Sequence, residues 1–125
     1  MLDTQLLLWA ADGSDRLPDA VLAILAERTS EVLFSSASIW EVAIKQGLQR
    51  PDFRVDARIL RRGLVEHHYR ELPVTGAHAA AVADLPPIHK DPFDRLLVAQ
   101  ATVDGILLLT SDAVVARYPG PIRRV

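Results

Sequence analysis

The sequence predicts a single α/β domain over residues 1–125, with a mostly parallel central sheet covered by helices on both faces. A chain of 125 residues is the size of one domain with one substantial core. Half of its residues are hydrophobic. Apolar residues at helical spacing alternate along the chain with short runs that are apolar throughout. Such runs are typical of strands buried on both faces, and helices between them place parallel strands side by side.

The first half of the chain predicts two strands and four helices. Met1 and Leu2 form a short strand that enters a buried helix, and Pro18 begins a second helix that extends to about Arg28. Residues 32–34 are a continuous apolar run rich in strand-forming residues. A helix over residues 38–47 follows, and then an amphipathic helix with a basic outer face over residues 56–68.

The second half predicts three strands and three helices. Residues 71–74 contain a proline and form at best an edge strand. Thr75 caps an alanine-rich helix that ends at Asp84, and a further helix begins at Asp91 and Pro92 and ends at Asp104. Residues 106–109 are the clearest buried strand. Residues 110–112 cap a last short helix, which precedes a terminal strand over residues 122–125.

Composition excludes several classes of protein and site. The chain has no cysteine, which excludes disulfides, thiolate catalysis and zinc held by cysteine. A metal site would therefore use oxygen ligands or the four histidines, and oxygen favours Mg²⁺ or Mn²⁺. No apolar stretch approaches the roughly 20 residues of a membrane span, so we expect a cytoplasmic protein. The net charge of −2 argues weakly against a dedicated nucleic-acid binder.

Four acidic residues stand at equivalent places, where a strand ends or a helix begins: Asp3, Glu41, Asp94 and Asp112. Ligands of parallel sheets bind at the carboxyl ends of the strands, so these four side chains can converge. Two carboxylates about 5 Å apart repel each other by roughly 3 kcal/mol at an effective dielectric near 20. A divalent cation would remove that cost, and Mg²⁺ completes its coordination with water and phosphate oxygens.

Each acid also has a purely structural interpretation. Ser38 and Glu41 have the spacing of a capping box, in which the glutamate accepts from the backbone N–H of Ser38. Asp91 is placed to cap a helix in which Asp94 is a favourable first-turn charge. Asp112 is another candidate cap, and Asp3 suits an Asx turn before a helix. Spacing alone leaves the structural interpretation and the metal site open.

Four motifs in order along the whole chain resemble those of PIN-domain ribonucleases, in particular VapC-type toxins of bacterial type II toxin–antitoxin (VapBC) systems: LDT at 2–4, SASIWEVAIK at 36–45, DPFDRLLVAQA at 91–101 and LLTSD at 108–112. The resemblance implies a PIN-like three-layer α/β/α domain. It also implies an Mg²⁺- or Mn²⁺-dependent endoribonuclease that cuts RNA of the tRNA or rRNA class by attack of a metal-activated water. A VapB-like antitoxin would inhibit it, and the family implies a homodimer or a toxin–antitoxin hetero-oligomer.

The resemblance also assigns roles to residues. The family's acidic quartet falls on Asp3, Glu41, Asp94 and Asp112, which would be both the catalytic and the metal-binding residues. In this interpretation Asp3 and Asp94 are direct ligands, while Glu41 and Asp112 hold the metal or its waters. Supporting roles fall on two hydroxyls, Thr4 and Ser111, and on two cations that would steady phosphate, Lys45 and Arg95. The structural alternative for Lys45 is a helical ion pair with Glu41.

Two positions depart from the family pattern. Only Met1 and Leu2 precede Asp3, so we expect either a truncated first strand, with a cost to metal affinity or stability, or a misassigned start site. Gln5 stands where many relatives have histidine. None of the four histidines is assigned a chemical role, because none has a partner at metal-ligand spacing: His67, His68, His78 and His89.

Two other functions fit the same sequence. The first is a PIN nuclease of RNA maturation, which differs from a toxin in its substrate and not in its site residues. The second is a catalytically silent PIN-like module that binds protein through the helix over residues 56–68. Arginines on the outer surface are candidates for RNA contact, and they are equally consistent with a solvated face: Arg54, Arg58, Arg61, Arg62, Arg123 and Arg124.

Overall fold

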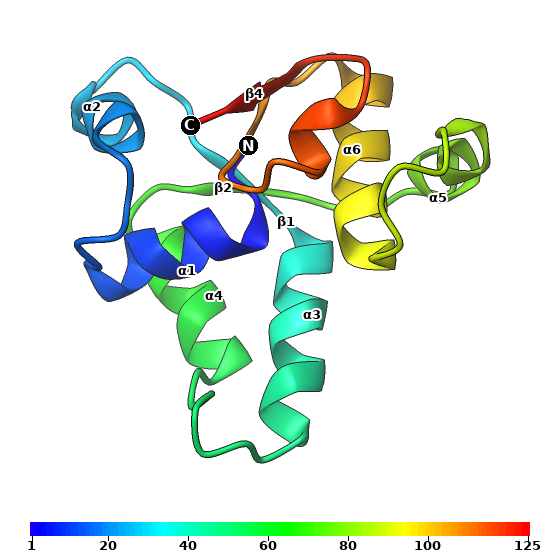
Figure 1. The fold of residues 1–125 in the computed structure, drawn as a ribbon. Coiled ribbons are helices and arrows are strands. Elements are labelled where there is room, and N and C mark those ends of the chain that lie inside the picture. Colours follow the sequence, from blue (N-terminus) through cyan, green and yellow to red (C-terminus); the bar gives the residue numbers. More distant parts are fainter.

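The computed structural model describes residues 1–125, and its helices and strands alternate as an α/β fold requires (Figure 1). The elements in chain order are α1 (Thr4–Asp12), α2 (Asp19–Ala26), β1 (Leu33–Ser35), α3 (Ser36–Gly47), α4 (Ala57–Glu66), β2 (Arg70–Leu72), α5 (Gly76–Ala81), the 3₁₀ helix η1 (Val82–Asp84), α6 (Pro92–Asp104), β3 (Leu108–Thr110), the 3₁₀ helix η2 (Val115–Arg117) and β4 (Ile122–Arg124). No helix has the length and apolar character that a membrane crossing requires.

The strands form a parallel sheet whose centre is the N-terminal segment. Strand β1 pairs with β2, and β3 pairs with β4, both in parallel. Leu2 lies between the two pairs: its amide donates to the Leu33 carbonyl at 3.1 Å, and it forms a parallel bridge with Leu109. The Asp3 amide then donates to the Leu109 carbonyl at 3.0 Å. The expected first strand is therefore present but is reduced to a single bridge, as the short segment before Asp3 predicts.

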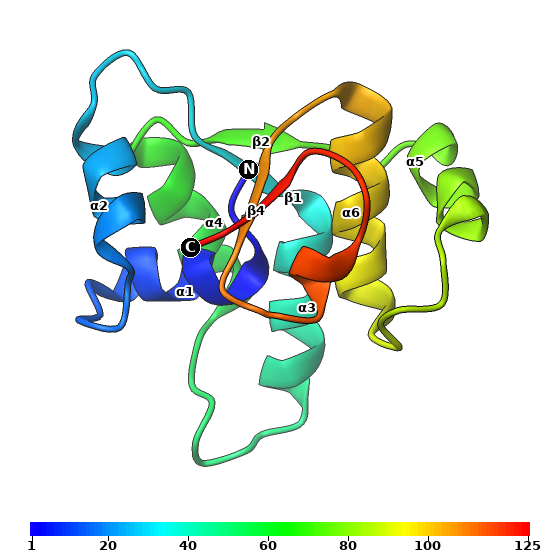
Figure 2. The same ribbon diagram turned by 45° about the horizontal axis from the view of Figure 1, so that its top comes forward.

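Alternation along these strands divides the core between the two faces of the sheet. Leu2, Phe34 and Leu109 belong to one apolar cluster, which packs against residues of α1, α2, α3 and α4. Their chain neighbours point the other way because successive side chains of a strand alternate in direction. Met1, Leu33 and Leu108 accordingly belong to a second cluster, built with residues of α6 and η2. Both faces are covered, which confirms the three-layer α/β/α arrangement (Figure 2).

Several boundaries differ from those that the sequence predicts. Strand β1 is Leu33–Ser35 and not 32–34, β2 is Arg70–Leu72 and not 71–74, and α2 ends at Ala26 and not at about Arg28. Three further differences have a local reason. Helix α3 begins at Ser36 because Ser35 is its cap and accepts from the amide of Ala37. Residues 106 and 107 do not join β3, because the amide of Ile106 donates to Ala101 and closes the end of α6 after Gly105. Helix α4 ends at Glu66, two residues early, where the backbone turns through a left-handed conformation at His68.

Candidate functional site

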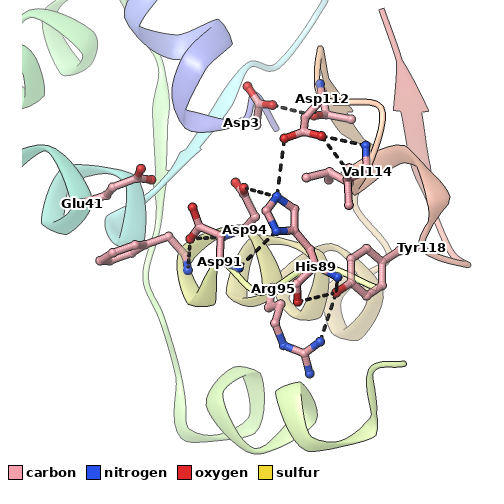
Figure 3. Close-up of polar contacts among 12 residues, drawn as sticks. Asp3, Glu41, His89, Asp91, Asp94, Arg95, Asp112, Val114 and Tyr118 are labelled. Atoms are coloured by element: carbon pink, nitrogen blue, oxygen red, sulfur yellow. Dashed lines mark hydrogen bonds and ion pairs between the residues drawn. The ribbon is translucent and has the colours of Figure 1, made fainter. Parts of the chain in front are cut away.

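The four predicted acids line one pocket at the carboxyl edge of the sheet. The pocket has a volume of about 330 Å³, and only one of its ten lining residues is hydrophobic. In Figure 3 the four carboxylates approach a common space from separate elements. The lining residues are Asp3, Thr4, Gln5, Leu8, Glu41, Lys45, Asp91, Asp94, Ser111 and Asp112. The sequence-predicted convergence of Asp3, Glu41, Asp94 and Asp112 therefore occurs in the folded chain.

Asp3 caps α1, and Asp112 binds the amides of the turn before η2, each through one carboxylate oxygen. Asp3 Oδ1 accepts from the amide of Leu6 at 2.8 Å, at the start of α1. Asp112 Oδ1 accepts from the amide of Val114 at 2.7 Å, before η2. In both residues the cap engages Oδ1 and leaves Oδ2 for other partners. The structural and the metal-binding interpretations of these two acids are thus compatible, because each uses a different part of the same carboxylate.

Helix α6 presents Asp94 without using it as a cap. Asp91 is the cap, and its Oδ1 accepts from the amides of Phe93 and Asp94 at 2.8 and 3.4 Å. Pro92 takes the first helical position, where the absence of an N–H costs nothing. The sequence analysis predicts this arrangement. Because Asp91 performs the capping, the Asp94 side chain is free to face the pocket from the first turn.

Glu41 is buried inside α3 and has one oxygen without any partner. The helix starts at Ser36, so the predicted capping box with Ser38 is wrong: Glu41 lies in the second turn. Its Oε2 accepts from Lys45 Nζ at 2.8 Å, as the helical spacing predicts. Its Oε1 is fully buried and accepts no hydrogen bond from the protein. A buried carboxylate oxygen with no donor is costly, so it indicates a position that another group completes.

Burial and neighbouring charges shift the pKa values of these acids. Burial, together with the nearby charges of Asp91 and Glu41, raises the pKa of Asp94 to about 7. Burial also raises the pKa of Asp3 above its ordinary value. Burial acts in the same direction on Asp112, but hydrogen bonds from the amides of Val114 and Val115 hold its pKa below the ordinary value. Asp94 is therefore partly protonated near neutral pH in the absence of a cation.

The hydroxyl that contacts the acids belongs to Thr110, whereas the sequence indicates Thr4 and Ser111. Thr110, which the sequence analysis does not select, donates to Asp3 Oδ2 at 2.6 Å and accepts from the amide of Asp112 at 3.0 Å. It thereby links two of the four acids. Thr4 lines the pocket but donates to Ser38 Oγ at 2.8 Å, which joins α1 to α3. Ser111 also lines the pocket. Thr110 could have been found in the sequence, because it ends β3 and directly precedes Ser111 and Asp112.

His89 is a second residue that the sequence analysis misses. Its Nε2 lies 3.2 Å from Asp94 Oδ2 and 3.5 Å from Asp112 Oδ2, between the two carboxylates (Figure 3). These three side chains offer ligand atoms within 4.8 Å of one another. The prediction that no histidine has a chemical partner is therefore wrong for His89. Sequence spacing did not reveal it, because one of its partners is 23 positions away and is brought close only by folding.

Arg95 does not line the pocket, contrary to its predicted role in steadying phosphate. Its guanidinium donates to the carbonyls of Pro86 and Val82, at 3.1 and 3.2 Å, and to the hydroxyl of Tyr118 at 3.0 Å. These bonds tie the segment before α6 to the helix itself. The predicted phosphate contact is therefore not available to Arg95 in this arrangement, whereas Lys45 remains at the wall of the pocket.

The residues of the pocket fit a hard divalent cation. Such ions prefer carboxylate oxygens and water, and the pocket offers the carboxylates of Asp3, Glu41, Asp94 and Asp112 in a polar space. The orphaned Glu41 oxygen and the raised pKa of Asp94 both indicate negative charge that the protein alone does not balance. A cation would bind the unpartnered Glu41 oxygen and displace the proton of Asp94.

Comparison with known proteins gives a family match and a match of fold. The PIN domain profile matches residues 1–121. Among solved structures, the crystal structure of VapBC2 from Rickettsia felis bound to a DNA fragment from their promoter contains a chain with a TM-score of 0.69 and 15% sequence identity. The match covers 99% of this chain and 96% of that one. No curated protein matches by sequence.

Proposed function

The chain belongs to the PIN domain family, whose members are generally nucleases, and from that premise we propose that it is a divalent-metal-dependent endoribonuclease of the VapC toxin type. The observation that carries the proposal is the pocket of four acids, in which Glu41 Oε1 is buried without a partner. If Asp3, Asp94 and Asp112 served only to begin helices, a fourth and buried carboxylate, that of Glu41, would not be needed beside them. The motif order along the chain and the VapC-like fold support the same assignment.

The proposed site divides its work among the chain's own residues. Asp3 and Asp94 bind the ion directly, and Glu41 and Asp112 hold it or its waters. When bound, Mg²⁺ or Mn²⁺ lowers the pKa of water for attack and neutralises charge on the phosphate. Lys45 neutralises part of the charge of Glu41 and lies where it can contact a phosphate oxygen. Thr110 fixes the orientation of Asp3, which is only 4% exposed.

RNA is the proposed substrate, of the tRNA or rRNA class that the family resemblance implies. A net charge of −2 does not oppose RNA binding once a divalent ion neutralises the acids in the pocket. Positive charge remains on the outer surface of α4, where Arg58, Arg61 and Arg62 surround a shallow pocket. Arg61 also pairs with Glu71 in two hydrogen bonds of 2.8 and 3.0 Å, so Arg58 and Arg62 are the freer phosphate contacts.

An antitoxin is the proposed inhibitory partner, and the chain offers an apolar groove for it. The similar solved structure is a VapBC2 complex. Between α1 and α4 lies a cavity of about 650 Å³ in which nine of fourteen lining residues are hydrophobic, among them Trp9, Ile59 and Leu60. Apolar residues on α3 and directly after it remain exposed as well, at Trp40, Ile44 and Leu48, and we propose them as the homodimer contact. The proposed location is the cytoplasm.

Two other functions stay open to the same tests. A PIN nuclease of RNA maturation would cleave a defined precursor without arresting growth. A small antitoxin-like reading frame directly upstream of the gene would favour the toxin. A silent protein-binding module would keep the groove and lose the ion. The unpartnered Glu41 oxygen argues for the nuclease, because a silent module gains nothing from a buried, unbalanced carboxylate.

The proposal is tested with the purified, antitoxin-free chain and total bacterial RNA. Samples with Mn²⁺, Mg²⁺ or EDTA are incubated in parallel, and new 5′ ends are mapped by sequencing. Asp94→Asn serves as the matched variant, because Asp91 retains the cap of α6 and the fold should persist. We expect discrete ends that need the metal and are absent from the variant. Equal background cleavage by both proteins, together with no effect of Mn²⁺ on wild-type melting, would favour the silent module.

A further inference from the structure

His89 lies beside the acidic pocket and contacts two of its carboxylates. It precedes α6 and is partly buried, with 21% of its side chain exposed. Its Nε2 is 3.2 Å from Asp94 Oδ2 and 3.5 Å from Asp112 Oδ2. Two roles are conceivable for a histidine in this position. It either binds the cation through Nε2 or donates the Nε2 hydrogen to the carboxylates that bind it.

The other ring nitrogen decides between these roles. Nδ1 of His89 lies 3.1 Å from the backbone amide of Asp91, which donates to it. An amide N–H can only donate, so Nδ1 must present its lone pair and carries no hydrogen. A neutral imidazole has one N–H, which therefore resides on Nε2. An Nε2 that carries hydrogen has no lone pair for a cation, and it points at the two acceptor oxygens.

The segment around His89 is fixed from a second side. The backbone amide of His89 donates to the hydroxyl oxygen of Tyr118 at 2.9 Å, and Arg95 donates to the same oxygen at 3.0 Å. Tyr118 is 4% exposed, so this junction is buried in the α6 side of the core. Figure 3 shows the resulting chain of contacts from Arg95 through Tyr118 to His89 and the two aspartates. The ring is thus anchored at its backbone and at Nδ1.

We infer that His89 is a positioning residue, whose Nε2–H orients the carboxylates of Asp94 and Asp112 toward the cation without binding the cation itself. The inference rests on the proposed metal site. One N–H shared between two neighbouring carboxylates reduces their repulsion and restricts rotation of both. Arg95 and Tyr118, which do not reach the pocket, act through the backbone of His89. Residues of this kind, which hold metal ligands in place, typically change metal affinity by about 10- to 100-fold when altered.

Two substitutions separate the two nitrogens. Asparagine in His89→Asn has polar atoms near the position of Nδ1 and none at Nε2, whereas glutamine in His89→Gln places an N–H near Nε2. The matched control is His68→Asn, which is exposed and already adopts the left-handed backbone that asparagine tolerates. We expect Mn²⁺ titration calorimetry to show an affinity about 10-fold weaker or more for His89→Asn. His89→Gln should recover most of this loss, and His68→Asn should match the wild type.

The ring state gives a readout independent of activity. In a metal-free sample with ¹⁵N-labelled histidine, long-range ¹H–¹⁵N correlation spectra should show His89 with hydrogen on Nε2 only. Addition of Mg²⁺ should leave that pattern unchanged. His78 is an internal reference, because its Nδ1 also accepts from a backbone amide and its Nε2 lies 3.0 Å from Asp104, away from the pocket. A loss of the Nε2 hydrogen of His89 on Mg²⁺ binding would make it a ligand and overturn the inference.

The titrations also separate this inference from the proposed function. If the wild type binds Mn²⁺ and His89→Asn binds it equally well, the positioning role is wrong and the metal site stands. If the wild type binds no Mn²⁺, the proposed function fails and the role of His89 fails with it. Thermal melting of each variant without metal reports whether the fold is intact, and an unfolded His89→Asn would leave His89→Gln and the spectra to decide.

Discussion

Burial has opposite energetic effects on the faces of the sheet and at its carboxyl edge, although the two regions contain neighbouring residues. Leu2 is 1% exposed and belongs to an apolar cluster with Leu6, Phe34 and Leu109. The next residue, Asp3, is 4% exposed and lies among three other acids. One step along the chain thus separates an apolar residue, which burial stabilises, from a carboxylate, whose burial is costly even though Asp3 caps α1. Such a cost at the edge of the sheet favours a bound cation, which would offset it.

The prediction with the greatest effect on stability concerns the apolar cluster that contains Phe34. Phe34→Ala removes the largest fully buried side chain of β1, and the cavity should lower the free energy of unfolding by about 3–5 kcal/mol. Urea denaturation of the two proteins measures the difference. The result should be the same with and without Mn²⁺, because Phe34 faces the α1 and α4 side of the sheet and not the pocket. A loss under 1 kcal/mol would mean that this cluster is loosely packed.

At the carboxyl edge of the sheet, replacement of a buried acid should maintain or raise the stability of the metal-free fold. Asp94→Asn removes a crowded, partly buried acid, so the metal-free variant should melt at or above the wild-type temperature at pH 8. Mn²⁺ at 100 times its dissociation constant should stabilise the wild type by about 2.7 kcal/mol and the variant far less. Differential scanning fluorimetry with and without Mn²⁺ compares the two. A large metal-free destabilisation by Asp94→Asn would indicate that Asp94 is a structural residue.

Thr110→Val is a smaller test of the same edge. The substitution keeps the shape of the side chain but removes the hydroxyl that donates to the buried Asp3 oxygen. Leaving that oxygen without a donor should cost about 1–3 kcal/mol in the absence of metal. Chemical denaturation with EDTA and with Mn²⁺ distinguishes the contributions, and the loss should shrink when Mn²⁺ is present. Thr4→Val is the matched control, because the Thr4 hydroxyl bonds to Ser38 and not to an acid.

The smallest effect is the pH dependence of the metal-free fold. The pKa of Asp94 is about 7 when folded and near 3.9 when unfolded, so between these values the folded state binds more protons. Its contribution to stability is therefore greatest below about pH 4 and is lost as the pH rises through about 7. Melting temperatures of wild type minus Asp94→Asn should fall from pH 5 to pH 8. Solvent screening of this half-buried group keeps the change modest, and a rising difference would reverse the assigned sign.

Much of the fold could be predicted because its signals are local. Asp91 and Pro92 begin α6, Thr75 caps α5, and Gly105 ends α6, each through contacts within a few residues. The position of the acids at strand ends follows from alternation of helices and strands, which the sequence displays directly. The boundaries that differ do so by about two residues. At α3 the boundary depends on which of several neighbouring serines takes the cap, and at α4 it depends on the left-handed backbone of His68.

The order of the elements, the parallel sheet and the four acids that meet at its edge can all be predicted from the amino-acid sequence. The groups that surround those acids are known only from the folded chain. His89 lies between Asp94 and Asp112, Thr110 holds Asp3, and Arg95 turns away to Tyr118. The physical reason is range. Caps and helical periods act over about four residues. In contrast, Asp112 lies 23 positions from His89, Tyr118 lies 23 from Arg95 and Asp3 lies 107 from Thr110, and packing of the sheet and α6 brings each pair together.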